Sequence, residues 1–200
     1  MAMELRPWTL PNFLTFARLA SLPFLIMAIL EGRHGVALAI FLVAAITDIM
    51  DGYVARRFAM GSPLGAWLDP IVDKLFLVST FVVFALPSTP TQLHIPIWLL
   101  VLTIFRDVFI VVICLVLFLA LGMRNFPPSI LGKLTTFLEI STVVAILLVN
   151  VHRLPEVVAR VCMQLVAAFA TASGLHYSWR VVTRLPRPGT AGGTPPVPPA

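Results

Sequence analysis

The sequence predicts an all-α integral membrane protein with six transmembrane helices. Hydrophobic residues make up 59% of the 200 residues and charged residues only 12%, whereas ordinary soluble domains are about 25% charged. The apolar residues are also grouped into long stretches, each close to the ~20 residues that cross a bilayer as a helix. Lipid offers the backbone no hydrogen-bond partners, so segments of this kind must be helical.

Six apolar segments are the predicted spans. In chain order they are residues 10–30, 36–57, 65–86, 95–121, 134–150 and 157–181. Short breaks rich in Gly, Pro and polar residues separate them. Residues 1–184 are therefore expected to form one membrane domain. Residues 185–200 are rich in Pro and Gly and too poor in apolar side chains to pack, so we expect a disordered tail.

Basic residues predict that both termini lie in the cytoplasm, because loops on that side carry an excess of Lys and Arg. Eight basic residues lie at the span ends on the same side of the membrane as the N-terminus, and three lie at the span ends on the other side. The first group is Arg6, Arg56, Arg57, Arg124, Lys133, Arg180, Arg184 and Arg187; the second is Arg33, Arg153 and Arg160. The net charge of +5 then reflects topology and attraction to anionic lipids, and not nucleic-acid binding. With no recognisable signal or transit peptide, a bacterial cytoplasmic membrane is expected.

Six of the nine acidic residues lie inside the predicted spans: Asp48, Asp51, Asp69, Asp73, Asp107 and Glu139. A carboxylate near the centre of a bilayer costs about 2.5–3.5 kcal/mol on insertion scales. The four aspartates of the second and third spans therefore need a compensating partner.

The spacing of these four aspartates predicts that they converge. Asp48 and Asp51 share one face of a helix, as do Asp69 and Asp73. Pro70 favours a third helix that begins close to Asp69, because proline is best tolerated in a first turn. The short connection makes the two spans antiparallel neighbours. Few cationic side chains are near, so one or two hard divalent cations, Mg²⁺ or Mn²⁺, are favoured over a salt-bridge network.

Two glycines accompany the aspartates. Gly52 follows Asp51 directly, and Gly65 lies one turn before Asp69. Glycine leaves room for a bulky ligand to approach the backbone. Close packing of membrane helices is the alternative interpretation of either glycine alone.

The pattern Asp48-x-x-Asp51-Gly52-x-x-Ala55-Arg56, then eight residues, then Gly65-x-x-x-Asp69-x-x-x-Asp73 resembles the signature of the CDP-alcohol phosphatidyltransferase family at all of its fixed positions. Three further segments are similar to the family: Pro11-Asn12-x-Leu14-Thr15-x-x-Arg18, Arg106-Asp107, and Gly132-Lys133-x-x-Thr136-x-x-Glu139. Glu139 departs from the family's usual Gln, which leaves its role open. The resemblance covers residues from about 5 to 182.

The resemblance implies a role for each of these residues. Asp48, Asp51, Asp69 and Asp73 would hold two divalent ions on the pyrophosphate of CDP-diacylglycerol, with Asp69 and Asp73 catalytic and Asp73 the candidate general base. The nucleotide-binding residues would be Gly52, Ala55, Arg56, Gly65, Asn12, Thr15 and Arg18, and the acceptor-binding residues Arg106 and Lys133. A hydroxyl would attack the lipid-side phosphorus and CMP would leave. A homodimer in the lipid bilayer is also implied.

The acceptor alcohol is less closely defined. Two cations, Arg106 inside the fourth span and Lys133 at the cytoplasmic start of the fifth, favour an anionic acceptor, and glycerol 3-phosphate fits best. Because Asp107 follows Arg106 directly and so lies about 100° around the helix, it is expected to be a poor full-time partner, which leaves Arg106 for a ligand. The alternative is that Arg106 pairs with Asp107 or Glu139. The Arg106-Asp107 pair and residues 167–177, however, look like CMP-forming cardiolipin synthases, whose acceptor is phosphatidylglycerol. Serine and inositol phosphate are further options.

Two other classes of function compete with a transferase. Intramembrane carboxylates also mark the pathways of ion and proton transporters. The sequence lacks the paired broken helices and the inverted repeats typical of many transporters. A catalytically inactive scaffold is disfavoured because all four aspartates of the signature are present.

Overall fold

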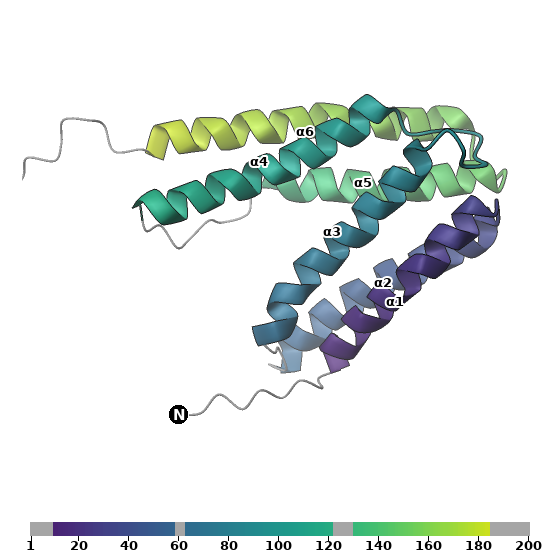
Figure 1. Cartoon of the computed structure of the whole chain (residues 1–200), viewed down its shortest axis with the longest axis horizontal. Helices are drawn as coiled ribbons and strands as arrows, with labels where there is room; N and C mark the ends of the chain where they lie inside the picture. Colours follow the sequence, from purple (N-terminus) through teal and green to yellow (C-terminus); the bar gives the residue numbers. More distant parts are fainter. Residues whose placement is uncertain (1–9, 59–62, 122–129, 185–200) are drawn as a thin grey trace, which may run out of the picture.

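The computed structural model describes residues 10–58, 63–121 and 130–184 (Figure 1); within these ranges only the backbone is described for residues 10–12, 49–58, 63–68, 114, 117, 118, 120, 121 and 180–184. The described residues form six α-helices and no strand. The helices are α1 (Leu10–Leu30), α2 (His34–Phe58), α3 (Pro63–Ala85), α4 (Ile97–Leu121), α5 (Ile130–Asn150) and α6 (Glu156–Arg184). The all-α prediction is confirmed. The predicted tail lies outside the described residues.

Three of the helices are long and apolar enough to cross a membrane, judged by length and composition over the described residues. They contain the stretches Phe13–Leu30, Ile130–Asn150 and Glu156–Trp179. Large apolar side chains also cover the outside of the molecule, among them Phe24, Val43, Trp98, Val111, Phe137 and Leu175. An outer surface of this kind suits lipid and would be a liability in water.

The predicted boundaries agree with the helices to within a few residues. The expectation that the third helix begins close to Asp69 was wrong. This helix begins at Pro63, so Pro70 lies in its interior and Asp69 lies well past its first turn. Pro63 supplies the proline that suits a helix start. An interior proline is tolerated in membrane helices because neighbouring groups can satisfy the backbone carbonyl that it leaves free.

Tight turns join the helices at one end of the molecule. After α1, Gly32 adopts a φ of +70°, and the amide of Arg33 donates to the carbonyl of Ala28 at 2.8 Å. After α5, His152 takes the same left-handed conformation, and the amide of Arg153 donates to the carbonyl of Leu148 at 2.9 Å. Both are helix C-caps that satisfy the last carbonyls and reverse the chain.

The core draws buried side chains from all six helices. It contains the fully or almost fully buried side chains Leu25, Phe41, Phe76, Phe84 and Ile146, with Phe41 and Phe76 in ring contact at 5.7 Å. In Figure 1 the helices lie close together near the described loops (residues 31–33, 86–96 and 151–155) and diverge toward their other ends, where α1 begins and α2 and α4 finish. α1 packs against both α2 and α3, while α5 packs against α2, α3 and α6. The second and third helices are therefore held beside the first.

Candidate functional site

Three of the four signature aspartates lie around one face of α1. Arg18 on α1 places Nη1 2.8 Å from Oδ1 of Asp48 on α2, and the same nitrogen pairs with Oδ1 of Asp73 on α3. Thr15, one turn before Arg18, donates from its hydroxyl to Oδ1 of Asp69 at 2.5 Å. One helix thus supplies a cation and a hydroxyl that link the aspartates of its two neighbours.

The helical period explains this arrangement. Thr15 and Arg18 are three residues apart, and Asp69 and Asp73 are four apart, so each pair lies on one face of its helix. The Arg18 side chain is only 3% exposed, whereas those of Asp48 and Asp73 are each 43% exposed. The guanidinium therefore lies at the base of the cluster, and the carboxylates open outward from it.

The donors in this cluster suit a hard divalent cation. Each of the three carboxylates has a second oxygen, and ligand sets made only of oxygen are preferred by Mg²⁺ and Mn²⁺. Among the described side chains, no three acidic, His or Cys residues lie close enough together to hold one ion. Arg18 provides the positive charge between Asp48 and Asp73 and sets their present spacing. The donor chemistry fits the metal, and the position between these two carboxylates is taken by the guanidinium.

Several residues of the sequence-based site have a described backbone only. Asp51, Gly52, Ala55 and Arg56 lie on the last turns of α2, Gly65 near the start of α3, and Asn12 near the start of α1. Their side chains lie outside the described residues, so their predicted roles stay predictions.

A pocket of about 130 Å³ lies beside two of the aspartates. Asp48, Asp73 and Arg18 form part of its lining, and apolar side chains form most of the rest. The full lining is Arg18, Phe41, Ala44, Ala45, Asp48, Asp73, Lys74, Phe76, Leu77, Thr136 and Ile140. Such a pocket can receive a ligand that has a charged group beside an apolar chain.

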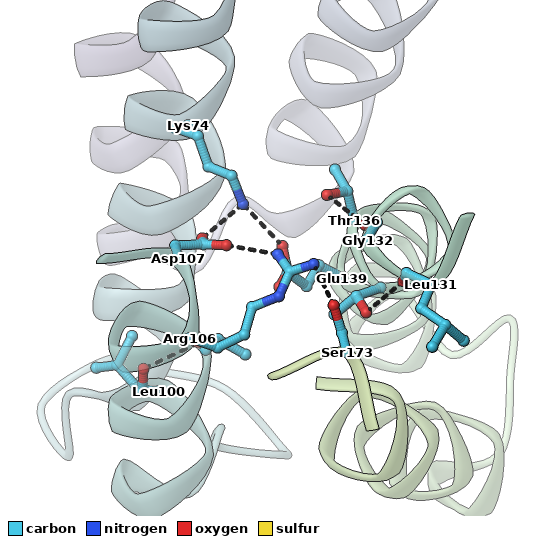
Figure 2. A network of polar contacts seen from close by, with 11 residues as sticks. Lys74, Leu100, Arg106, Asp107, Leu131, Gly132, Thr136, Glu139 and Ser173 are labelled. Carbon is cyan, nitrogen blue, oxygen red and sulfur yellow. Dashed lines mark hydrogen bonds and ion pairs between the residues drawn. The ribbon is translucent and has the colours of Figure 1, made fainter. Parts of the chain in front are cut away.

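A second polar cluster joins α3, α4, α5 and α6 (Figure 2). Lys74 on α3 places Nζ 2.6 Å from Oδ2 of Asp107 on α4 and 3.6 Å from Oε2 of Glu139 on α5. Arg106 donates from Nη1 to Oδ1 of Asp107 at 2.6 Å and from Nη2 to the hydroxyl of Ser173 on α6 at 2.9 Å. Two cations and two carboxylates thus meet among the four helices. We call these five residues the Lys74 network.

The Lys74 network corrects the expectation that Asp107 is a poor partner for Arg106. The Cα–Cβ bonds of neighbouring residues do point apart, but the long Arg106 side chain curves back to reach the adjacent carboxylate. Arg106 is 6% exposed and engaged on two sides. Lys133 lies on the first turn of α5 and is exposed. The two predicted acceptor residues thus differ sharply in their surroundings.

Sequence reasoning did not assign Lys74, Glu139 or Ser173 to a common cluster. The only signal was charge: Lys74 and Glu139 are both ionisable residues inside apolar spans, and such residues usually pair. Ser173 lies between the small residues Ala172 and Gly174. Ser173 itself is fully buried and faces Arg106 of α4.

Comparison with known proteins identifies relatives. A family model described as CDP-alcohol phosphatidyltransferase matches residues 8–173. A putative cardiolipin synthase of Mycobacterium bovis is 33% identical over 133 residues, which are 66% of this chain and 61% of that protein. A rice protein, cardiolipin synthase (CMP-forming), is 47% identical over 77 residues, 37% of this chain and 23% of its own length.

A relative with another named acceptor is also similar. CDP-diacylglycerol–glycerol-3-phosphate 3-phosphatidyltransferase 2 of Arabidopsis thaliana is 44% identical over 78 residues, 37% of this chain and 33% of that protein. In each of these three comparisons the chain spans less than two thirds of the relative's length.

Proposed function

Because the chain belongs to the CDP-alcohol phosphatidyltransferase family, we propose that it transfers a phosphatidyl group from CDP-diacylglycerol to an alcohol and releases CMP. The observation that carries this proposal is the position of Asp48 and Asp73 at a pocket with mostly apolar walls, with Asp69 held beside them by Thr15. A lipid nucleotide needs both a polar, oxygen-rich site and an apolar space, and the two adjoin here.

The reaction follows from the chemistry of the bonds. The acceptor hydroxyl attacks the phosphorus on the lipid side of the pyrophosphate; a new O–P bond forms, the pyrophosphate O–P bond breaks, and CMP leaves with its electron pair. We propose that Asp73 accepts the proton of the hydroxyl, a role supported by its position in the pocket lining and its 43% exposure. Asp48, Asp51, Asp69 and Asp73 would hold two divalent ions, Mg²⁺ or Mn²⁺, which stabilise negative charge on the attacking and leaving oxygens.

α1 contributes to the proposed nucleotide site. Thr15 and Arg18 are buried and fix Asp69 and Asp73 from behind. Asn12, Gly52, Ala55, Arg56 and Gly65 would complete this site, as the resemblance implies.

The proposed topology has six spans with both termini in the cytoplasm, in a bacterial cytoplasmic membrane. The described reversals at residues 31–33, 86–96 and 151–155 lie at one end of the molecule, and by the sequence-based assignment three basic residues belong to that side of the membrane and eight to the other. This distribution supports a cytoplasmic site. We also expect a homodimer, which cross-linking in native membranes would test.

The acceptor that we favour is phosphatidylglycerol. The sequence favoured glycerol 3-phosphate on the argument that Arg106 is available to a soluble phosphate, whereas Arg106 is bonded to Asp107 and Ser173. The names of the mycobacterial and rice relatives point to phosphatidylglycerol, the acceptor of a cardiolipin synthase. Glycerol 3-phosphate is the second candidate, supported by the Arabidopsis relative.

A product assay tests the acceptor. Purified protein would receive labelled CDP-diacylglycerol with phosphatidylglycerol, glycerol 3-phosphate, serine or inositol phosphate, one at a time, and the lipid product would be identified. Labelled cardiolipin from phosphatidylglycerol is expected. Phosphatidylglycerophosphate from glycerol 3-phosphate, with no cardiolipin, would overturn the acceptor assignment and leave the phosphatidyl transfer intact.

A further inference from the structure

Lys74 connects the two polar clusters of the molecule. It follows Asp73 directly in α3, and it lines the same pocket as Asp73, Asp48 and Arg18. Its ammonium is also the group that Asp107 and Glu139 hold from α4 and α5 (Figure 2). Lys74 is therefore the member of the Lys74 network that reaches the proposed active site.

The surroundings of Lys74 fix its ammonium without enclosing it. A lysine inside a membrane helix usually extends toward the headgroups, but here two carboxylates from two other helices hold the charge. An ammonium has three N–H donors, and two acceptors leave one of them. The side chain is 38% exposed, against 19% for Asp107 and 3% for Glu139. Lys74 is thus the most exposed of these three charged side chains, and it is the one that lines the pocket.

The charges indicate what this ammonium can bind. Asp107 is shared between Lys74 and Arg106, each at 2.6 Å, and Glu139 lies farther off, at 3.6 Å. Lys74 is thus only partly neutralised. A ligand group that suits it is an anionic oxygen in a pocket with mostly apolar walls, which is the chemistry of a phosphate on a lipid.

We propose that Lys74 binds a phosphate oxygen of a lipid substrate, and that Asp107 and Glu139 are positioning residues that hold its ammonium at the pocket wall. This inference rests on the proposed function. Two sources of phosphate are available, the pyrophosphate of CDP-diacylglycerol and the phosphodiester of phosphatidylglycerol, and the test separates them.

Chemical labelling of the wild-type protein is the direct test, because the chain has only two lysines, Lys74 and Lys133. An amine-reactive acetylating reagent would be applied in mixed micelles with CDP-diacylglycerol alone, phosphatidylglycerol alone or diacylglycerol, and each lysine quantified by mass spectrometry. One substrate alone permits no turnover. We expect at least one phosphate lipid to protect Lys74 and diacylglycerol not to do so. Equal labelling of Lys74 in all three lipids would overturn the proposal.

Kinetics of two variants separate a ligand from a structural residue. Losing one charge-assisted hydrogen bond corresponds to about a 10- to 100-fold loss of affinity. Lys74→Gln should raise the KM of the substrate that protects Lys74 from labelling by about that factor, and it should leave the KM of the other substrate nearly unchanged. Lys74→Arg should restore part of the lost affinity. Arg160→Gln, an exposed site on α6 paired with Glu156, is the matched control. A fall in melting temperature and kcat with both KM values unchanged would contradict the assignment.

The labelling result also distinguishes this inference from the proposed function. A protein that shows lipid-specific protection of Lys74 but forms no CMP would retain the phosphate site and overturn the transferase. A protein that forms CMP with Lys74 equally labelled in every lipid would retain the transferase and overturn the phosphate site.

Discussion

Arg18 on α1 lies 2.8 Å from Asp48 on α2, with its Nη1 directed at the carboxylate Oδ1. The same nitrogen reaches Asp73 on α3, so a guanidinium provides positive charge at a place where the resemblance expects a divalent ion. Arg18 can therefore keep the two carboxylates together when no metal is bound. Removing one partner of a buried ion pair leaves charge uncompensated and destabilises the fold.

The first prediction follows from this pairing. Arg18→Met should lower the melting temperature in EDTA, and Mg²⁺ or Mn²⁺ should raise the melting temperature of the variant more than that of the wild type. The reason is that the ion supplies the charge that the variant lacks. Thermal unfolding in detergent with and without metal measures both effects. The same metal-induced shift in both proteins would show that Arg18 and the metal do not serve the same carboxylates.

The second prediction concerns the metal itself. Carboxylates from two helices supply hard oxygen donors, so activity should disappear in EDTA and return with Mg²⁺ or Mn²⁺. Phosphatidyl transfer would be assayed after chelation and after each ion is restored. Full turnover in a preparation shown by elemental analysis to be free of metal would rule out the proposed role of the four aspartates.

The third prediction concerns the aspartates one at a time. Asp48→Asn, Asp51→Asn and Asp69→Asn should each reduce turnover by orders of magnitude, because an amide is a poor ligand for a hard cation. Membrane insertion should be unaffected, since each change removes an intramembrane charge. Glu31→Gln, an exposed residue at the opposite end of α1, is the control. Near-normal turnover in any of the three variants would remove that residue from the metal site.

The fourth prediction concerns the stability of the Lys74 network. Asp107→Asn should destabilise the protein by several kcal/mol, because Lys74 and Arg106 would keep their charges and lose their shared carboxylate. Ser173→Ala should cost less, about 1.5–3 kcal/mol, for one hydrogen bond to a charged group.

A double-mutant cycle isolates the pair. Arg106→Met combined with Asp107→Asn should be less destabilising than the sum of the two single changes, because each residue compensates the charge of the other. Equilibrium unfolding in detergent would give the free energies. Additive effects would mean that the contact at 2.6 Å contributes little.

Much of the fold could be predicted because hydrophobic length is a strong signal in a membrane protein. The first span was predicted at residues 10–30 and α1 has those bounds. The fifth was expected from residue 134, but α5 begins at Ile130 because the helix continues through Gly132 and Lys133. Polar residues at a span end do not stop a helix where water or headgroups begin.

The convergence of Asp48, Asp69 and Asp73 was predicted from helical spacing and the short connection between the two spans; in the structure α1, which packs against both α2 and α3, links them. The partners of these aspartates were not predicted. Arg18 is far from Asp73 in the sequence, and only the packing of α1 against α2 and α3 brings them together. The pairing of Asp107 with Arg106 was not favoured, because spacing along a helix gives the directions of the Cβ atoms and not the reach of a long arginine side chain. The meeting of Lys74 with Glu139 needs the contact between α3 and α5, which no local pattern encodes.

Release of CMP tests the central claim most directly. Purified protein in mixed micelles with Mg²⁺ and CDP-diacylglycerol should release CMP when an acceptor alcohol is added, in equal amount to the new phospholipid, and Asp73→Asn should release almost none. The wild-type protein would be folded and loaded with metal, and it would receive phosphatidylglycerol, glycerol 3-phosphate, serine and inositol phosphate in turn. No release of CMP with any of these acceptors would contradict the proposed phosphatidyl transfer.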